Sequence, residues 1–234
     1  MKGTFFETGK GFVVCEVELP PLKDDEILIR NMACGICGTD VHIYHGGKGS
    51  AEVPHSVILG HEYAGEVIKT GRKVSLFKTG DRVTVDPNIY CGQCRPCRTG
   101  KKQHCENLTA IGVNKNGGFA QYSIVPEKQA FLLGSDIDYE AGALAEPIAC
   151  CIHGMDKASV RSGDTVCIIG GGTIGLIMTQ LAKLNGAGTV ILSEPVEKNR
   201  KAGLELGADY AIDPFASGLQ EQIAELTGRS SVDV

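Results

Sequence analysis

The stretch "DTVCIIGGGTIGLIMTQLAKLNG", residues 164–186, joins two apolar runs through three consecutive glycines. The first run is short and rich in β-branched residues, as in a buried strand. The second run places its apolar side chains on one helical face: Ile174, Ile177, Met178 and Leu181. A strand that enters a helix through a glycine turn is the opening of a βαβ unit, so this stretch predicts a parallel sheet.

The residues that follow repeat the alternation of strand and helix. Strand-like runs occupy 189–194 and 210–213, and each precedes a helical pattern that a glycine ends, at Gly207 and at Gly228. Residues 160–234 therefore predict a βαβαβ arrangement and hence an α/β domain.

The first part of the chain has a different sequence pattern. Short β-branched runs alternate with turns rich in glycine, proline and aspartate, and no long helix is expected; the runs are 26–33, 61–71, 81–87 and 119–126. This pattern favours an antiparallel sheet or barrel. We therefore expect a β-rich domain over 1–159 and an α/β domain over 160–234, for which 234 residues suffice.

The charge balance and the apolar runs exclude some classes of protein. With 23 Lys and Arg against 28 Asp and Glu, the net charge of −5 argues against nucleic acid as a partner. The N-terminus lacks the pattern of a signal peptide, and the longest apolar run, 166–178, is too short to cross a bilayer. We expect a cytoplasmic protein without membrane partners, whose ten cysteines are thiols or metal ligands rather than disulfides.

Four cysteines lie within one short loop: Cys91, Cys94, Cys97 and Cys105. The spacing C-x2-C-x2-C-x7-C lets four thiolates close a tetrahedron around zinc, and an all-cysteine site without an open position is structural. The basic residues of the loop suggest a zinc ribbon that binds nucleic acid, but ribbons carry two separated C-x2-C pairs. Four unrelated cysteines are a third interpretation, which the polarity of the loop disfavours. We expect a structural zinc lobe.

A second group of metal-ligating residues is split between two segments. Cys37 lies in "GICGTD", and His61 and Glu62 lie in "GHEYAG". A cysteine, a histidine and a carboxylate are the kind of ligand set that a catalytic zinc needs, with one coordination position left open. Taken alone, Cys37 is equally well read as a buried thiol. A redox pair with Cys34 would need a helix N-terminus after the first cysteine.

The glycines Gly170, Gly172 and Gly175 form the pattern G-x-G-x-x-G between the expected strand and helix. In this position they allow a tight turn, a close approach of backbone to a pyrophosphate and tight packing of helix on strand. The first helical residues, Thr173 and Ile174, then face the phosphates from the helix N-terminus. Other α/β proteins also contain glycine-rich turns, but the strand and helix on either side favour a partial Rossmann domain.

An acid follows at the end of the next expected strand. Glu194 lies 19 residues after Gly175, where an acid binds the ribose hydroxyls of NAD. Pro195 comes next, so no arginine stands directly beside the acid to accept the 2′-phosphate of NADP. We therefore expect NAD as the cofactor.

Read in order, seven motifs resemble the zinc-dependent medium-chain alcohol dehydrogenases, and most closely the branch of sorbitol, threonine and butanediol dehydrogenases. They are "GICGTDVH", "GHEYAGEV", "GDRVTVDP", the four-cysteine lobe, "GGFAQY", "AEPIACCIHG" and "GGGTIGL", and the similarity extends to residue 234. The resemblance implies a β-rich, GroES-like catalytic domain with the structural zinc lobe, followed by a Rossmann domain that binds the nicotinamide cofactor.

The resemblance also implies roles for particular residues. Cys37 and His61 match ligands of a catalytic zinc, and Glu62 matches an acid that ligates the metal or stands next to it. Asp40 matches an acid that orients the ligand histidine. Glu146 stands where alcohol dehydrogenases proper carry a third ligand cysteine and the polyol branch carries glutamate. This difference favours polyols or vicinal hydroxyl compounds as substrates.

The implied activity is the transfer of a hydride from an alcohol to NAD. Zinc lowers the pKa of a coordinated alcohol oxygen. The Thr39 hydroxyl and His42, which can titrate near neutrality, would then relay the proton to solvent. The expected catalytic residues are thus Thr39, His42, Glu62 and Glu146.

Members of this family continue beyond the point that matches residue 234, which suggests a C-terminally truncated chain. In the strand order 3-2-1-4-5-6, the first strand would then leave an exposed edge, which a second copy or another chain would cover. The alternative to a dehydrogenase is a catalytically incompetent remnant that acts as a zinc-stabilised interaction or structural module.

Overall fold

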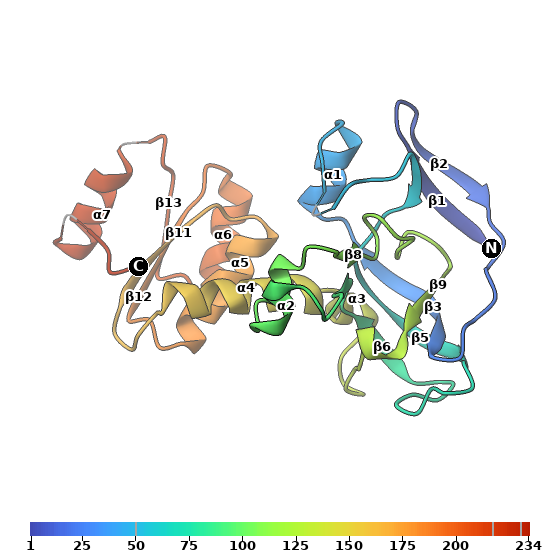
Figure 1. Ribbon diagram of the computed structural model, residues 1–234. Helices are drawn as coiled ribbons and strands as arrows, with labels where there is room; N and C mark the ends of the chain where they lie inside the picture. The colour runs from blue at the N-terminus through green and yellow to red at the C-terminus, as the bar shows by residue number, and fades with distance from the viewer. Residues whose placement is uncertain (50, 217, 230) are drawn as a thin grey trace. The chain divides into compact units, whose positions relative to one another are not determined.

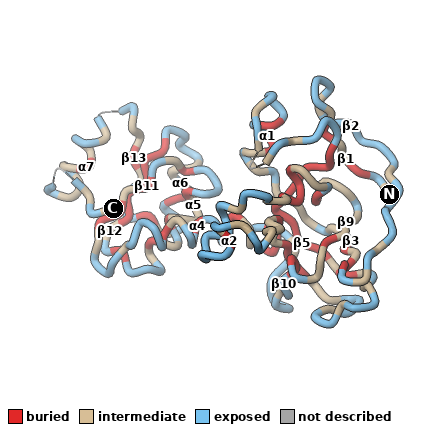
Figure 2. The backbone as a smooth tube through the Cα atoms, in the orientation of Figure 1, coloured by how far each residue is buried: buried red, intermediate tan, exposed pale blue. Residues whose placement is uncertain are grey.

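The chain forms two compact units, Met1–Glu146 and Pro147–Val234, in a computed structural model that describes residues 1–49, 51–216, 218–229 and 231–234 (Figure 1). Within each unit the buried residues gather in the strands (Figure 2). Helix α4 (Ala145–Ala158) begins at this division, whereas the sequence placed the boundary after it, between 159 and 160. Most of α4 therefore groups with the second unit.

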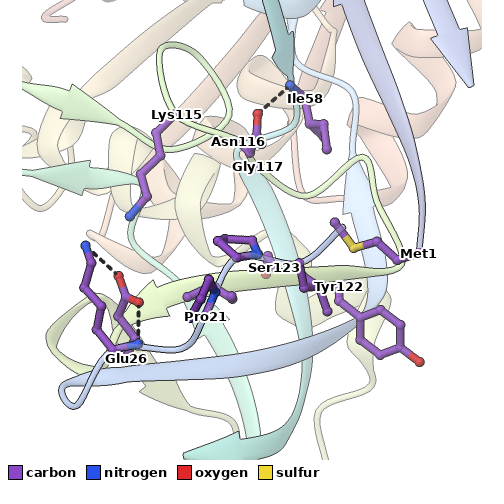
Figure 3. Close-up of a pocket in the computed structure, with 13 residues that line it drawn as sticks. Met1, Pro21, Glu26, Ile58, Lys115, Asn116, Gly117, Tyr122 and Ser123 are labelled. Carbon is purple, nitrogen blue, oxygen red and sulfur yellow. Dashed lines mark hydrogen bonds and ion pairs between the residues drawn. The ribbon is translucent and has the colours of Figure 1, made fainter. Parts of the chain in front are cut away.

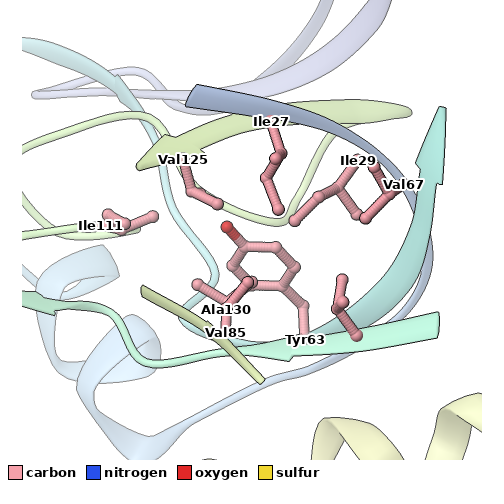
Figure 4. Packing of buried hydrophobic residues seen from close by; sticks show 9 residues of the cluster. Ile27, Ile29, Tyr63, Val67, Val85, Ile111, Val125 and Ala130 are labelled. Atoms are coloured by element: carbon pink, nitrogen blue, oxygen red, sulfur yellow. The ribbon is translucent and has the colours of Figure 1, made fainter. Parts of the chain in front are cut away.

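The first unit is built on a five-stranded antiparallel sheet in the order β10-β6-β5-β3-β9. The strands are β3 (Glu26–Gly35), β5 (Glu62–Thr70), β6 (Arg82–Val85), β9 (Tyr122–Pro126) and β10 (Ala130–Leu132). One face packs a core rich in β-branched side chains, including Ile27, Ile29, Val67 and Val125 around Tyr63 (Figure 4). Because side chains alternate along a strand, burying these residues on one face fixes the register of the sheet.

Smaller elements complete the first unit. A three-stranded sheet in the order β2-β1-β4 contains β1 (Lys2–Glu7), β2 (Gly11–Glu16) and β4 (Ser56–Ile58). The helical segments are α1 (Gly38–Tyr44), α2 (Arg95–Arg98), α3 (Tyr139–Ala143) and the 3-10 turns η1 (Lys102–His104) and η2 (Glu127–Gln129). The pair β7 (Asn88–Ile89) and β8 (Thr109–Ala110) closes the loop that contains α2 and η1. The predicted β-rich, antiparallel architecture is confirmed.

The second unit contains a parallel sheet in the order β11-β12-β13. Its strands and helices alternate as β11 (Thr165–Ile169), α5 (Thr173–Leu184), β12 (Thr189–Ser193), α6 (Glu197–Glu205), β13 (Tyr210–Ile212) and α7 (Leu219–Thr227). Four successive residues of the central strand β12 are buried, as expected for a parallel sheet covered on both faces. The predicted βαβαβ arrangement is confirmed.

The outer edge of β11 pairs with the last residues of the chain. Cys167 N–H donates to Val234 O at 2.9 Å, and Asp233 N–H donates to Thr165 O at 2.9 Å. Arg229 supports this pairing by donating to Asp233 Oδ2 at 3.0 Å and to Thr165 Oγ1 at 2.7 Å. The expectation of an exposed first strand is therefore wrong for this part of β11, because residues 233–234 take the place of a fourth strand.

Helix α4 also corrects the expectation that residues 1–159 contain no long helix, since it extends over 14 residues. Pro147, Cys151 and Met155 recur every four positions and form its buried face. Gly154 and the polar residues between them weaken the helical pattern in the sequence. No helix in the described part of the chain is both long and apolar enough to span a membrane.

Candidate metal centres and dinucleotide site

The four cysteines of the predicted lobe come together in the structure. The sulfur atoms of Cys91, Cys94, Cys97 and Cys105 all lie within 4.8 Å of one another. Helix α2 begins directly after Cys94, with Pro96 in its first turn, and this turn brings Cys97 Sγ to 4.0 Å from Cys91 Sγ. Cys105 follows η1, and the N–H of Cys91 donates to its Sγ at 3.3 Å. Four sulfurs so close together fit one tetrahedral zinc ion.

Backbone N–H groups of the lobe stabilise the thiolate form of its cysteines, whereas burial destabilises that form. Cys94 N–H donates to Cys91 Sγ at 3.4 Å. The N–H groups of Cys94 and Gln93 lower the pKa of Cys91 to about 6, whereas burial raises the pKa of Cys97 to about 12. A buried thiolate needs a positive charge beside it, and a cation shared by all four sulfurs would supply it.

The second predicted metal centre forms where two paired strands meet. Gly35, at the end of β3, pairs with Glu62, at the start of β5. This pairing brings Cys37 next to His61 and Glu62, with one ligand atom of each within 4.8 Å of the others. Gly35 leaves room for the acid, since a Cβ at this position would lie 2.5 Å from Glu62 Oε2. The structure thus groups three of the four residues predicted to ligate a catalytic zinc.

Asp40 lies against His61, where the resemblance placed it. Its side chain is buried, and its Oδ2 accepts a hydrogen bond from the Cys37 N–H at 2.9 Å. Its Oδ1 lies 3.7 Å from His61 Nδ1, which is longer than a hydrogen bond. Both atoms are buried and lack a hydrogen-bond partner among the described residues. Such unpaired buried atoms are costly, and a metal ion that fixes the histidine ring would account for their arrangement.

The charges around His61 favour a cation. Burial lowers the pKa of His61, but Cys37 and Asp40 raise it by more, to about 9. Cys34 differs from Cys37, because burial and then the nearby carboxylates raise its pKa to about 12, and it lies outside the cluster. Helix α1 begins only after Cys37. Cys34 therefore has the environment of a protonated thiol, which does not favour a redox pair.

Glu146 is the predicted ligand that does not join this cluster. It is half-buried at the start of α4, and its charge contributes to the raised pKa of His61. Among the described residues, the group of ligand atoms within 4.8 Å of one another contains Cys37, His61 and Glu62 only. A direct bond between Glu146 and a metal stays a prediction.

The residues predicted to relay a proton lie on α1. Thr39 is half-buried in the first turn and His42 is exposed three residues later, so the two neighbour each other on the helix surface. Gly47 lies against His42, and a Cβ there would overlap the imidazole ring. No signal in the sequence predicts this contact, because glycines after a helix usually indicate only its end.

The glycine turn after β11 has the geometry that its motif predicts. Gly170 has a φ of +100°, which residues with a side chain rarely adopt. A Cβ at Gly175 would overlap the carbonyl oxygen of Gly170, so glycine allows α5 to start this close to β11. Gly172 is the N-cap of α5, and nothing lies within 4 Å of the position of its Cβ. This open side, at the helix start formed by Thr173 and Ile174, suits a phosphate group.

Glu194 lies next to this turn, at the end of β12, and is 6% exposed. Its Oε2 accepts a hydrogen bond from Gly171 N–H at 2.5 Å, and its Oε1 accepts one from Val196 N–H at 2.7 Å. These two N–H groups lower the pKa of Glu194. The carboxylate is therefore ionised and oriented, and its oxygens retain lone pairs for the hydroxyls of a ligand.

Arg200 is a neighbour of Glu194 that the sequence reasoning missed. Its Nη1 donates to the backbone oxygens of Glu194 and Pro195, both at 2.7 Å, and lies 3.2 Å from Asp213 Oδ2. Because Arg200 lies in α6 rather than directly after the acid, a search of the adjacent position does not find it. A basic residue in the first turns of the helix after this strand is the signal that would have found it.

Gly175→Ala is expected to destabilise the second unit by about 1–3 kcal/mol, the usual cost of overpacking. The reason is the overlap of its Cβ with the Gly170 carbonyl oxygen. Gly172→Ala is the matched control, because its Cβ has open space, and it should lower the free energy of unfolding by less than about 1 kcal/mol. Urea unfolding followed by circular dichroism measures both variants. Equal losses would contradict the packing role of Gly175.

Two family models match the chain. Residues 23–135 match the alcohol dehydrogenase GroES-like domain, and residues 173–234 match the zinc-binding dehydrogenase model. The chain is 37% identical to the L-threonine 3-dehydrogenase of Pyrococcus horikoshii, over 97% of this chain and 65% of that protein. It is 34% identical to the sorbitol dehydrogenase of Bacillus subtilis, over 100% of this chain and 67% of that protein.

A solved structure has the same fold. A zinc-binding dehydrogenase from Sinorhizobium meliloti 1021, solved with NADP bound, is 44% identical and superposes with a TM-score of 0.90. The match covers 94% of this chain and 64% of that one. The chain thus spans about two thirds of the length of the relatives that it matches.

Proposed function

Because the chain belongs to the family of zinc-dependent medium-chain alcohol dehydrogenases, we propose that it transfers a hydride from a polyol or secondary alcohol to NAD, giving a ketone. The observation that carries this proposal is the grouping of Cys37, His61 and Glu62 within 4.8 Å. Three ligands from two segments, with a buried acid behind the histidine, have the composition of a catalytic rather than a structural zinc site.

We propose two zinc ions with different tasks. The structural ion would be held by the lobe of Cys91, Cys94, Cys97 and Cys105, which leaves no open position. The catalytic ion would be held by Cys37, His61 and Glu62, with Glu146 close by, and when bound it supplies a Lewis acid for the alcohol oxygen.

Residues of α1 would carry the proton away. The half-buried Thr39 hydroxyl can accept a proton from a substrate hydroxyl and donate its own. His42 is exposed on the same helix and can pass a proton to solvent. Because Gly47 has no side chain, it leaves the space that the His42 ring occupies free. The order Thr39, His42, solvent is thus a path from a partly buried position to bulk water.

NAD is the proposed cofactor because of Glu194. An ionised carboxylate accepts hydrogen bonds from ribose hydroxyls and repels a 2′-phosphate. Arg200, a basic side chain beside this acid, is already bound to two backbone oxygens and to Asp213. Since the Sinorhizobium meliloti relative was solved with NADP, the test must compare both cofactors.

Glu194→Gln is expected to weaken NADH binding about tenfold, the value of a hydrogen bond to a charged group. NADPH binding should be unchanged or tighter, because the variant removes the repulsion of the 2′-phosphate. Fluorescence titration with each reduced cofactor measures the difference. Glu197→Gln is the control: Glu197 is exposed and paired with Lys201, so a change of no more than about twofold is expected. Equal losses for NADH and NADPH would argue against a contact between Glu194 and the ribose.

Glu146→Cys is expected to slow the loss of the catalytic zinc to a chelator and to lower kcat by about tenfold. A thiolate donates more charge than a carboxylate, so the metal would be held more firmly and would be a weaker Lewis acid. Chelator competition and steady-state kinetics measure the two effects, with the exposed Glu140 as the site of a control substitution to cysteine. Unchanged kinetics and an unchanged rate of zinc loss would mean that Glu146 is not part of the metal site.

The activity itself is tested with the zinc-loaded chain, NAD and a panel of sorbitol, other polyols, 2,3-butanediol and threonine. The proposed function predicts NADH formation that depends on both zinc and the alcohol. If the chain binds zinc and cofactor but reduces no NAD, the alternative of a zinc-stabilised interaction module becomes the better account. A homo-oligomer that covers the remaining edge of β11 is a further part of the proposal, which sedimentation of the same sample tests.

A further inference from the structure

A pocket in the first unit is separate from both groups of metal-ligating residues (Figure 3). Its cavity volume of about 230 Å³ corresponds to about eight water molecules. None of the residues that line it belongs to either metal cluster. Much of the wall is apolar, with Met1, Leu19, Pro21, Ile58 and Tyr122. An apolar wall of this kind suits the hydrocarbon part of a ligand.

The charged side chains of the pocket lie at one end, with Lys115 and Glu26 opposite Met1 and Tyr122 (Figure 3). The α-ammonium of Met1 donates to Val17 O at 2.9 Å. Glu26 is 6% exposed, and its charge is compensated by Lys23, whose Nζ lies 3.5 Å from Glu26 Oε1. The backbone N–H of Lys23 donates to Glu26 Oε2 at 3.1 Å. Glu26 is therefore already paired on both of its oxygens.

Lys115 is the second basic side chain of the pocket. Its ammonium makes no hydrogen bond or ion pair with any residue that the structure describes. Lys115 is half-buried, and this burial lowers its pKa. Other polar groups of the pocket are engaged: Asn116 Oδ1 accepts from Ile58 N–H at 3.1 Å, and Ser123 Oγ donates to Asn31 Oδ1 at 2.9 Å. A ligand would thus meet, at one end of an apolar cavity, the Lys115 ammonium, which the carboxylates of Glu26 and Asp25 influence without forming an ion pair with it.

We propose that this pocket binds a small monocarboxylate with an apolar body, its carboxylate paired with Lys115 and its hydrocarbon against Met1, Ile58 and Tyr122. One unpaired ammonium matches one negative charge. A phosphate monoester would bring a second negative charge close to Glu26, and a neutral molecule would leave Lys115 unpaired. The proposal is independent of the dehydrogenase activity, because no residue of the pocket belongs to the metal or dinucleotide sites.

Hexanoate is a suitable probe, with hexanamide as the uncharged molecule of the same shape. The zinc-loaded, ¹⁵N-labelled chain is titrated with each, and the readout is the backbone amide signals of Asn116, Gly117 and Ser123. These signals separate the pocket from carboxylate binding at a zinc ion. Hexanoate should shift them saturably, and hexanamide should bind at least about tenfold more weakly, as expected for loss of a charge-assisted hydrogen bond.

Lys115→Met keeps the length of the side chain and removes the charge, and it should weaken hexanoate binding at least about tenfold. Lys128→Met is the matched control, because Lys128 is exposed and does not line the pocket; it should bind as the wild type does. Lys115→Arg should retain binding and keeps the test decisive if the methionine variant is unstable. Equal binding to Lys115→Met, or hexanoate shifts that leave Asn116, Gly117 and Ser123 unaffected, would overturn the proposal.

Discussion

Replacing Cys97 with serine is expected to release one zinc ion per chain and to unfold the four-cysteine lobe. Cys97 is 8% exposed, and its sulfur lies among the other three. The strands that close the lobe, β7 and β8, are only two residues long, so the lobe has little other structure to hold it. Zinc binding stabilises small all-cysteine and cysteine–histidine folds by about 10–16 kcal/mol at neutral pH. Loss of one ligand should therefore leave the lobe largely unfolded.

Metal analysis and limited trypsin digestion measure this outcome. The lobe contains three trypsin sites, Arg98, Lys101 and Lys102, because Pro96 blocks cleavage after Arg95. Cleavage at these sites should accelerate by more than about tenfold, because each 1.4 kcal/mol lost raises the open population tenfold. Cys15→Ser is the control, since Cys15 is exposed and outside both clusters. If Cys97→Ser retains its full zinc content and its resistance to trypsin, the lobe is not a structural zinc site.

His61→Ala is expected to remove the second zinc ion and to lower turnover by at least about a thousandfold. Lewis-acid stabilisation amounts to several kcal/mol, and about 4 kcal/mol corresponds to a factor of a thousand. Asp40→Asn should have a smaller effect, about 10- to 100-fold, because it changes only the residue behind the ligand. The difference in turnover between the two variants distinguishes a metal ligand from the acid that orients it.

Zinc content and NAD reduction are measured on the same samples. His55→Ala is the control, since His55 is exposed and lies outside the cluster, and it should retain both zinc and activity. Turnover of the His61→Ala variant within about tenfold of the wild type, a loss too small for a missing Lewis acid, would mean that this cluster is not the catalytic centre. A variant that keeps both zinc ions would lead to the same conclusion.

The features predictable from the sequence are those that short segments determine. The spacing of Cys91, Cys94, Cys97 and Cys105 is enough to predict one site, because a turn of helix and a 3-10 turn bring neighbours in the chain together. The glycines after β11 likewise act through the local backbone, as the positive φ of Gly170 and the close contact between Gly175 and Gly170 show. In both cases residue type and spacing carry the information.

Contacts between distant segments were harder to predict. Cys37 meets His61 only because β3 and β5 pair in one register, so residue chemistry alone left Cys37 undecided and the resemblance suggested the partner. The contact of Gly47 with His42 and the position of Arg200 beside Glu194 depend on how loops and helices return to the site. The contact of Gly47 has no pattern in the sequence that distinguishes it from an ordinary turn, and Arg200 is indicated only by its place in the first turns of α6.

The pairing at the edge of β11 is another contact between distant segments that is hard to predict from the sequence. Strand order predicted where a fourth strand belongs, but the pairing of residues 233–234 with Thr165 and Cys167 depends on hydrogen bonds from very few residues. The ion pair of Arg229 with Asp233, which also binds the Thr165 N–H, holds this segment in place. Arg229 and Asp233 read as ordinary polar residues in the sequence, because their spacing fits a helix as well as a turn.

The proposed zinc-dependent dehydrogenase activity requires that this chain bind a nicotinamide cofactor. Its most direct test is a titration of the zinc-loaded, 234-residue chain with NADH, followed by the fluorescence of the cofactor. Saturable binding that the Glu194→Gln substitution weakens is expected. A chain that holds zinc in both clusters and shows no saturable NADH binding would contradict the proposed activity.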